Sequence, residues 1–98
     1  MATKAENIAV VNNEAEERFQ AKLGGKVAYL QYHKGAGHII FIHTEVPEEM
    51  EGKGIGSKLV KAGLEHAKTE RVRIVAQCPF VASYIRRHQE YQSLLASE

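Results

Sequence analysis

Two side chains suited to proton transfer lie where a hydrophobic segment ends. His43 and Glu45 stand two residues apart, just before Pro47. In a regular strand they share a face with Phe41 and Ile39, so we expect partial burial of the Glu45 carboxyl group. The alternative is a solvated carboxylate at a strand end. Both residues are candidate general bases.

Cys78 is the single cysteine, so no intramolecular disulfide can form. It directly precedes Pro79, which suits the first turn of a helix. The sulfur is therefore expected near a helix N-terminus, where the helix dipole favours a reactive thiolate. Two roles stay open for Cys78: an acyl-accepting nucleophile, or a small buried side chain.

A glycine-rich segment joins a hydrophobic strand to an amphipathic helix. Its sequence is Gly52-Lys-Gly-Ile-Gly56. Glycines here permit a tight turn that exposes backbone N–H groups at the positive end of a helix dipole, which suits a phosphate or pyrophosphate. Alternatively the glycines only let the loop pack closely. The spacing fits neither a Walker loop nor a dinucleotide-binding fingerprint, so we expect neither a nucleotide triphosphatase nor a dehydrogenase.

Hydrophobic periodicity predicts the elements that position these residues. Strands are expected at residues 8–11, 18–23, 26–33, 38–46 and 73–77, and helices at residues 55–68, 79–88 and, as a short tail, 91–95. The strand at residues 38–46 is apolar on both faces at its start, so we expect it in the middle of the sheet, covered on both sides. The fold class is α+β: an antiparallel meander leads into a βαβα unit with a mixed sheet.

Composition narrows the class of protein. The chain has 98 residues, enough for one domain spanning residues 1–98 with a core at about 8–95. With 13 basic and 12 acidic residues it is not basic enough to predict nucleic-acid binding. The longest apolar run, residues 39–42, is too short to cross a membrane, and the N-terminus lacks a hydrophobic signal core. We expect a cytoplasmic protein without a membrane partner.

Metal binding is not expected. His33, His38 and His43 recur every five residues, but a predicted turn separates the first two and odd spacing alternates strand faces. No cysteine or carboxylate completes a recognisable ligand shell.

Residues 46–59, Val-Pro-Glu-Glu-Met-Glu-Gly-Lys-Gly-Ile-Gly-Ser-Lys-Leu, resemble the acetyl-CoA signature of Gcn5-related N-acetyltransferases. In that signature a strand ends at Val-Pro, and Arg/Gln-x-x-Gly-x-Gly/Ala then opens a helix. Gly54 and Gly56 match, whereas Glu51 stands where the family has Arg or Gln. Together with residues 43–47 and 78–91, the resemblance extends to the minimal single-domain subgroup, whose acceptor surface is expected to be open.

The resemblance implies where acetyl-CoA would bind. The backbone of residues 44–46 would line the pantetheine arm and acetyl carbonyl, and backbone N–H groups of residues 50–56 would hold the pyrophosphate. Ser57 either adds a hydroxyl donor or only caps the helix. The implied cofactor-binding residues are Thr44, Val46, Met50, Glu51, Gly52, Lys53, Gly54, Ile55, Gly56 and Ser57.

The predicted function is acetyl-CoA-dependent N-acetylation of an amine on a small molecule or peptide, by direct transfer. Glu45 or His43 would be the base. The resemblance implies Tyr84 as the acid, although periodicity alone places it in a core stripe. A Cys78 acyl-enzyme is the second route. Rival hypotheses are a non-catalytic acyl-CoA-binding module and a purely structural domain, and we expect a monomer or weak homodimer.

Overall fold

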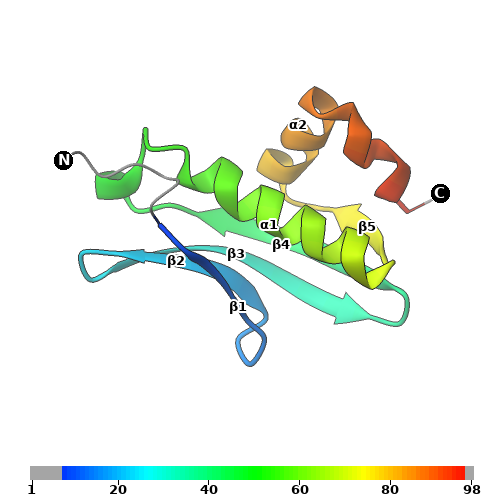
Figure 1. The fold of residues 1–98 in the computed structure, drawn as a ribbon, viewed down its shortest axis with the longest axis horizontal. Helices are drawn as coiled ribbons and strands as arrows, with labels where there is room; N and C mark the ends of the chain where they lie inside the picture. Colours follow the sequence, from blue (N-terminus) through cyan, green and yellow to red (C-terminus); the bar gives the residue numbers. More distant parts are fainter. Residues whose placement is uncertain (1–7, 97–98) are drawn as a thin grey trace.

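The computed structural model describes residues 8–96 and contains a five-stranded sheet with two α-helices (Figure 1). In chain order the elements are β1 (Val10–Asn13), β2 (Arg18–Leu23), β3 (Lys26–Gly35), β4 (His38–Glu45), the 3-10 helix η2 (Glu48–Met50), α1 (Ile55–Glu70), β5 (Arg73–Ala76), α2 (Pro79–Arg87) and the 3-10 helix η3 (Gln89–Leu94). The predicted element types are confirmed, with two differences: a 3-10 turn interrupts the expected loop after Pro47, and the C-terminal tail is 3-10 rather than α-helical.

The strands lie in the sheet in the order in which they occur in the chain. β1 to β4 pair antiparallel, and β5 pairs parallel to β4 after the α1 crossover. The Gly24-Gly25 pair makes the tight hairpin between β2 and β3, where Leu23 faces Lys26. The sheet is therefore mixed, and the predicted α+β meander followed by a βαβα unit is confirmed.

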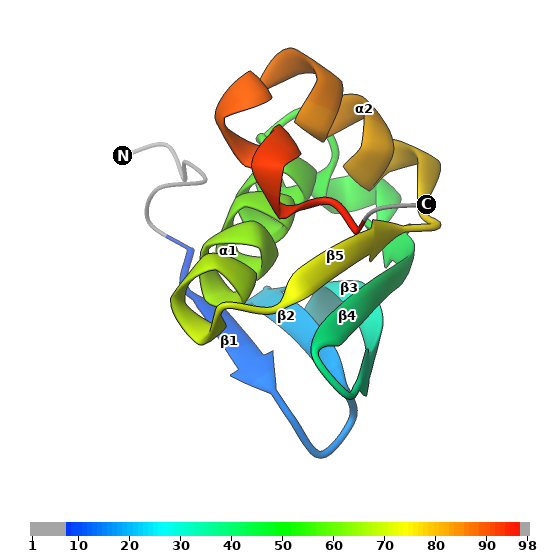
Figure 2. The same cartoon turned by 90° about the vertical axis from the view of Figure 1, so that its right-hand side faces the viewer.

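Helices cover one face of this sheet, as the side view in Figure 2 shows. On β3, Ala28, Leu30 and Tyr32 are buried, whereas Val27 and Tyr29 between them are only half-buried. This alternation is typical of a strand with one covered face. Our expectation for residues 38–46 was wrong on both points.

β4 is the fourth of five strands rather than the middle one. Ile42 in β4 is 41% exposed, because no described element packs over the face of the sheet opposite the helices. The apolar run at residues 39–42 therefore did not indicate that a second layer covers the other face of the sheet.

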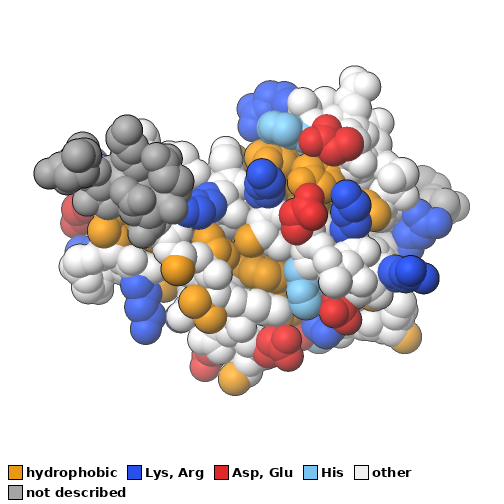
Figure 3. Space-filling view, viewed as in Figure 1, with side chains coloured by type: hydrophobic (Ala, Val, Ile, Leu, Met, Phe, Trp, Pro, Cys, Tyr) orange, Lys and Arg blue, Asp and Glu red, His pale blue; other side chains and the backbone are white. Residues whose placement is uncertain are grey.

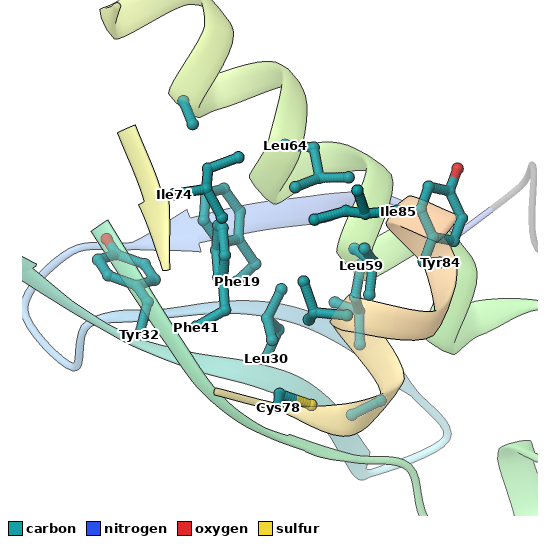
Figure 4. Close-up of a cluster of buried hydrophobic side chains, with 14 of the residues drawn as sticks. Phe19, Leu30, Tyr32, Phe41, Leu59, Leu64, Ile74, Cys78, Tyr84 and Ile85 are labelled. Carbon is teal, nitrogen blue, oxygen red and sulfur yellow. The ribbon is translucent and has the colours of Figure 1, made fainter. Parts of the chain in front are cut away.

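The core lies between α1 and the covered face of the sheet (Figure 4). Apolar side chains recur every three or four residues along α1, and this spacing places them in one continuous stripe on the helix. The buried members of that stripe are Ile55, Leu59, Val60, Gly63, Leu64 and Ala67. They pack against Phe19, Leu30 and Phe41 from β2, β3 and β4. This packing fixes α1, and with it the glycine loop at its N-terminus, against the sheet.

Among the described residues, no helix is both long enough and apolar enough to cross a membrane. On the face seen in Figure 3, basic and acidic side chains are interspersed rather than gathered by sign.

A hydrogen bond ties the C-terminal η3 to α1. The hydroxyl of Tyr91, a buried residue, donates to Glu65 Oε2 at 2.6 Å. Burial, and after it the bond to the Glu65 carboxylate, raises the pKa of Tyr91 well above its ordinary value. The phenol therefore stays neutral in the folded protein at a pH at which an exposed tyrosine ionises.

We predict that Tyr91→Phe lowers the free energy of unfolding at neutral pH by about 1 kcal/mol, because the hydrogen bond is lost. Its pH dependence should also change. Since the folded pKa is raised, the wild-type contribution is complete below about pH 10 and is lost as the pH rises, by up to about 1.4 kcal/mol per unit.

The variant should therefore lose stability more slowly than the wild type under alkaline conditions. Tyr32 and Tyr84, whose pKa values are also raised by burial, keep some alkaline dependence in both proteins. Urea denaturation at a series of pH values measures this, and equal slopes above pH 10 would contradict the role of Tyr91.

Candidate functional site

β4 and β5 separate at their C-terminal ends, near the N-terminus of α1, and this separation creates the site. Their register ends with the pair Phe41 and Ala76. The Cys78 N–H still donates to the Phe41 carbonyl at 2.9 Å, but the chain then turns into α2. β4 continues alone to Glu45. The backbone of residues 42–45 is therefore left without a strand on that side.

Two neighbouring cavities occupy the opening, with volumes of about 340 and 230 Å³. They share four lining residues: Val46, Glu51, Gly56 and Phe80. The larger is completed by Thr44 and Glu45. The smaller is completed by Met50, Gly52, Gly54, Ile55 and Ser57. We call the two together the β4–α1 groove. It runs from the free end of β4 to the first turn of α1.

The N-terminus of α1 opens directly into this groove. Gly54 is the N-cap, with φ of +74°, a conformation that L side chains rarely adopt, and no side chain caps the helix. The first turn contains no acidic residue. Within residues 8–96 no side chain caps the N–H groups of this turn, which face the groove, and the helix dipole adds a positive potential. This end of the groove has the chemistry of an anion site.

Of the other residues predicted for this loop, the structure brings most to the groove and leaves one out. Met50 lines the smaller cavity, although the residue is 1% exposed and its side chain anchors η2 in the core. Ser57 lines the same cavity. Lys53 lines neither cavity, although the resemblance implied it among the cofactor-binding residues.

Thr44 and Cys78 meet on the helix-covered side of the opening. Thr44 Oγ1 lies 3.2 Å from Cys78 Sγ, and Cys78 is 3% exposed. Cys78 is the N-cap of α2, as its position before Pro79 predicted. Thr44 lines the larger cavity, whereas Cys78 lies behind it. The thiol therefore contacts the groove through the Thr44 hydroxyl.

His43 and Glu45 lie on the opposite, uncovered face of the sheet. His43 Nε2 is 2.8 Å from Glu45 Oε1, and each side chain is 56% exposed. The expectation that they share a face with Phe41 was wrong, because the β3–β4 register shifts at this point: Tyr32 pairs with Phe41, but Gln31 pairs with His43. The extra residue reverses the alternation of faces.

Tyr84 does not join these residues. It is buried on α2, its ring stacks on His88 at 3.9 Å, and burial raises the pKa of its hydroxyl. Figure 4 shows the hydroxyl pointing away from Cys78, and Tyr84 lines neither cavity of the groove. The structure thus places Tyr84 in the core stripe that periodicity predicted. It does not bring the hydroxyl to the position expected of an acid.

Phe80 is the groove residue that the sequence analysis missed. It lies in the helix predicted at residues 79–88 without having been singled out there as a site residue, yet the residue is 38% exposed and lines both cavities. A Cβ on Gly56 would lie 3.0 Å from Phe80 Cζ, so the ring rests directly against the backbone of Gly56. Because Gly56 has no side chain, the Phe80 ring can pack against its backbone and form part of the groove wall.

A third cavity of about 530 Å³ lies between β5, α2 and the C-terminal segment. It is lined mainly by apolar side chains and contains none of the residues predicted for chemistry. Its volume is greater, but the uncapped N-terminus of α1 and Glu45, the partner of His43, belong to the β4–α1 groove. Within residues 8–96, no cluster of three or more histidine, cysteine or acidic side chains has the geometry of a metal site.

A sequence profile of GCN5-related N-acetyl-transferases matches residues 18–94, which includes every element from β2 to η3. The chain belongs to this family. The NMR structure of a GCN5-like protein from Staphylococcus aureus is similar over 94% of this chain and 91% of that chain, with a TM-score of 0.71 and 27% sequence identity. The fold of this chain is therefore the GCN5-related N-acetyltransferase fold.

More distant relatives of this GCN5-related chain are vertebrate proteins called NATD1. The protein from Xenopus tropicalis is 25% identical over 85 residues, covering 84% of this chain and 78% of the relative. The human protein is 26% identical over 84 residues, covering 83% and 74%. The similarity spans most of each chain and includes both sides of the groove.

We predict that Cys78 reacts slowly with a thiol reagent such as 5,5′-dithiobis(2-nitrobenzoate) while the protein is folded. Burial behind Thr44 should slow the reaction at least roughly tenfold relative to the protein in urea, because access requires local opening. Since Cys78 is the single cysteine, the released chromophore reports on it alone. A folded-state rate equal to that in urea would contradict this burial.

Proposed function

We propose that this protein transfers the acetyl group of acetyl-CoA to an amine by direct transfer within a ternary complex. The observation that carries the proposal is the continuity of the β4–α1 groove. One end has uncapped helix N–H groups suited to a pyrophosphate, and the other has Thr44 and the carboxylate of Glu45. Family membership supports acetyl transfer as the chemistry.

In this proposal the first turn of α1 binds the pyrophosphate, with Ser57 in reach as a hydroxyl donor. The free backbone edge of residues 44–46 holds the pantetheine arm, and the Phe80 ring packs against it at Gly56. When bound, acetyl-CoA would supply a thioester: the amine nitrogen would bond to the carbonyl carbon and lose its surplus proton to solvent, the carbon–sulfur bond would break, and the departing thiolate would take up a proton from solvent.

His43 and Glu45 serve as the base. A primary amine is protonated near neutral pH and must lose a proton before it attacks. If His43 Nε2–H donates to Glu45 Oε1, Nδ1 keeps a lone pair that can accept this proton, and the carboxylate stabilises the charge that results. The pair lies at the mouth of the groove because Glu45 also lines the larger cavity.

Direct transfer is preferred to an acyl-enzyme on Cys78. The thiol is buried, and the Thr44 side chain lies between it and the groove. An acetyl group on Cys78 Sγ would need space on the helix-covered side, where the core is closed.

The test is a calorimetric titration of acetyl-CoA into the protein, paired with thermal melting and with NAD and ATP as controls. A selective ligand at a hundredfold excess over its dissociation constant raises the free energy of unfolding by about 2.7 kcal/mol. We expect this shift with acetyl-CoA and a much smaller one with either control. Equal responses to all three ligands would refute the proposal.

A non-catalytic acyl-CoA-binding module is the second candidate, favoured by the exposure of His43 and Glu45. Release of CoA in the presence of an amine panel distinguishes the two functions, since a module would bind acetyl-CoA without turnover.

We also predict that Glu51→Gln strengthens acetyl-CoA binding by about two- to fivefold at low ionic strength. Glu51 lines both cavities, and its carboxylate repels a bound pyrophosphate. The gain should shrink as salt is added, because the repulsion is screened.

Glu48→Gln is the matched control for this charge. Glu48 is an exposed carboxylate in the adjoining η2 turn, but it lines neither cavity. Calorimetry on the three proteins measures the effect. Equal tightening by both substitutions would mean that net charge, and not the position of Glu51, controls the affinity.

A further inference from the structure

Four side chains form a connected row across the uncovered face of the sheet. The guanidinium of Arg18, on β2, lies 4.9 Å from the centre of the Tyr29 ring on β3. The Tyr29 and His43 ring centres are 6.3 Å apart, edge to face. His43 then contacts Glu45 at 2.8 Å. We call these residues the open-face row. It crosses three adjacent strands and ends at the mouth of the groove, because Glu45 lines the larger cavity.

The two ends of the row carry opposite charges. Glu45 is the anionic end. Arg18 is the cationic end: it donates from Nε to the Gln20 side chain at 2.9 Å, and within residues 8–96 no carboxylate lies in salt-bridge range of it. The Tyr29 ring between the charges is half-buried and offers a flat apolar surface. A complementary ligand has a cation at one end and an anion at the other.

The length of the row selects among such ligands. Arg18 and Glu45 are separated by two strand spacings and, by register, by two residues along the strands. At about 4.8 Å per strand and 3.3 Å per residue, this places their Cα atoms roughly 12 Å apart. A small amino acid cannot span that distance, whereas about three residues of an extended peptide can. No described helix covers this face, so a longer chain can lie across it (Figure 2).

We propose that the open-face row binds the acceptor, and that the acceptor is a peptide whose reactive amine lies about three residues from an acidic side chain. The ammonium group binds at Glu45 and His43, and the acidic side chain pairs with Arg18. The intervening chain packs on Tyr29. This inference rests on the proposed acetyl transfer, and it adds the class of acceptor and the residue that selects it.

The experiment uses the full chain, acetyl-CoA and three peptides blocked at both ends. Each has one lysine and differs only three residues away, where it carries glutamate, glutamine or arginine. Mass spectrometry gives kcat/KM for each peptide. The wild type should favour the glutamate peptide over the glutamine peptide by about fivefold at low ionic strength, and salt should reduce this ratio.

Variants assign the preference to Arg18. Arg18→Gln should bring the ratio of kcat/KM for the glutamate and glutamine peptides close to one. Arg18→Glu should make the arginine peptide a better substrate than the glutamate peptide. A purely structural role for Arg18 would not reverse the preference. Lys22→Gln is the matched control, since Lys22 is an exposed cation on β2 outside the row. It should keep the wild-type ratio.

The outcomes separate this inference from the proposed function. Acetylation without a glutamate preference, or a preference that survives Arg18→Glu, overturns the inference and leaves acetyl transfer standing. If acetyl-CoA binds but no peptide is acetylated above the uncatalysed rate, the peptide acceptor is overturned. If acetyl-CoA does not bind, both fall.

Discussion

The parallel pairing of β4 with β5 stops at Phe41 and Ala76, and the groove exists because it stops there. A strand that kept its partner to Glu45 would present no free backbone edge between the sheet and the helices. The separation is held open by two anchors. The Cys78 N–H donates to the carbonyl of Phe41, the last paired residue of β4, and Cys78 is also the N-cap of α2. On the other side of the groove, the buried stripe of α1 fixes that helix against the sheet. The free edge of β4 is thus held between α1 and α2, which both pack on the sheet.

One extra residue in β4 then divides the chemistry between the two faces. The register shift after Phe41 leaves Thr44 opposite buried Leu30 and turns His43 and Glu45 to the uncovered side. In an unbroken strand, His43 would point into the core beneath α1, where a polar ring without a partner is costly to bury. The bulge therefore permits a titratable pair beside a closed core. It also places the contact between Thr44 and Cys78 on one side of β4 and the pair of His43 and Glu45 on the other side.

Local sequence signals were sufficient for most of the fold. The amphipathic stripe along α1 and the helix start at Cys78-Pro79 both follow from residues close together in the sequence, and both were predicted correctly. The errors arose where a property depends on distant parts of the chain. A bulge at Ile42 depends on its partner strand, and burial of the second sheet face depends on covering elements, which residues 8–96 do not place there. Phe80 was missed for the same reason, since its position in the predicted helix says nothing about its contact with Gly56, which lies far away in the sequence.

An open site limits the ways in which the proposed reaction can be accelerated. With His43 and Glu45 each 56% exposed, water screens their charges, and a low-dielectric enhancement of acid–base chemistry is largely lost. Positioning is the remaining source of rate: the amine must be held at the groove mouth with little freedom. A small amine would find few contacts there, because the described part of the chain supplies no enclosing wall on the uncovered face. A chain that lies along the sheet would bring its own cover, exclude water from the His43 and Glu45 pair, and so complete an active site that this domain builds only in part.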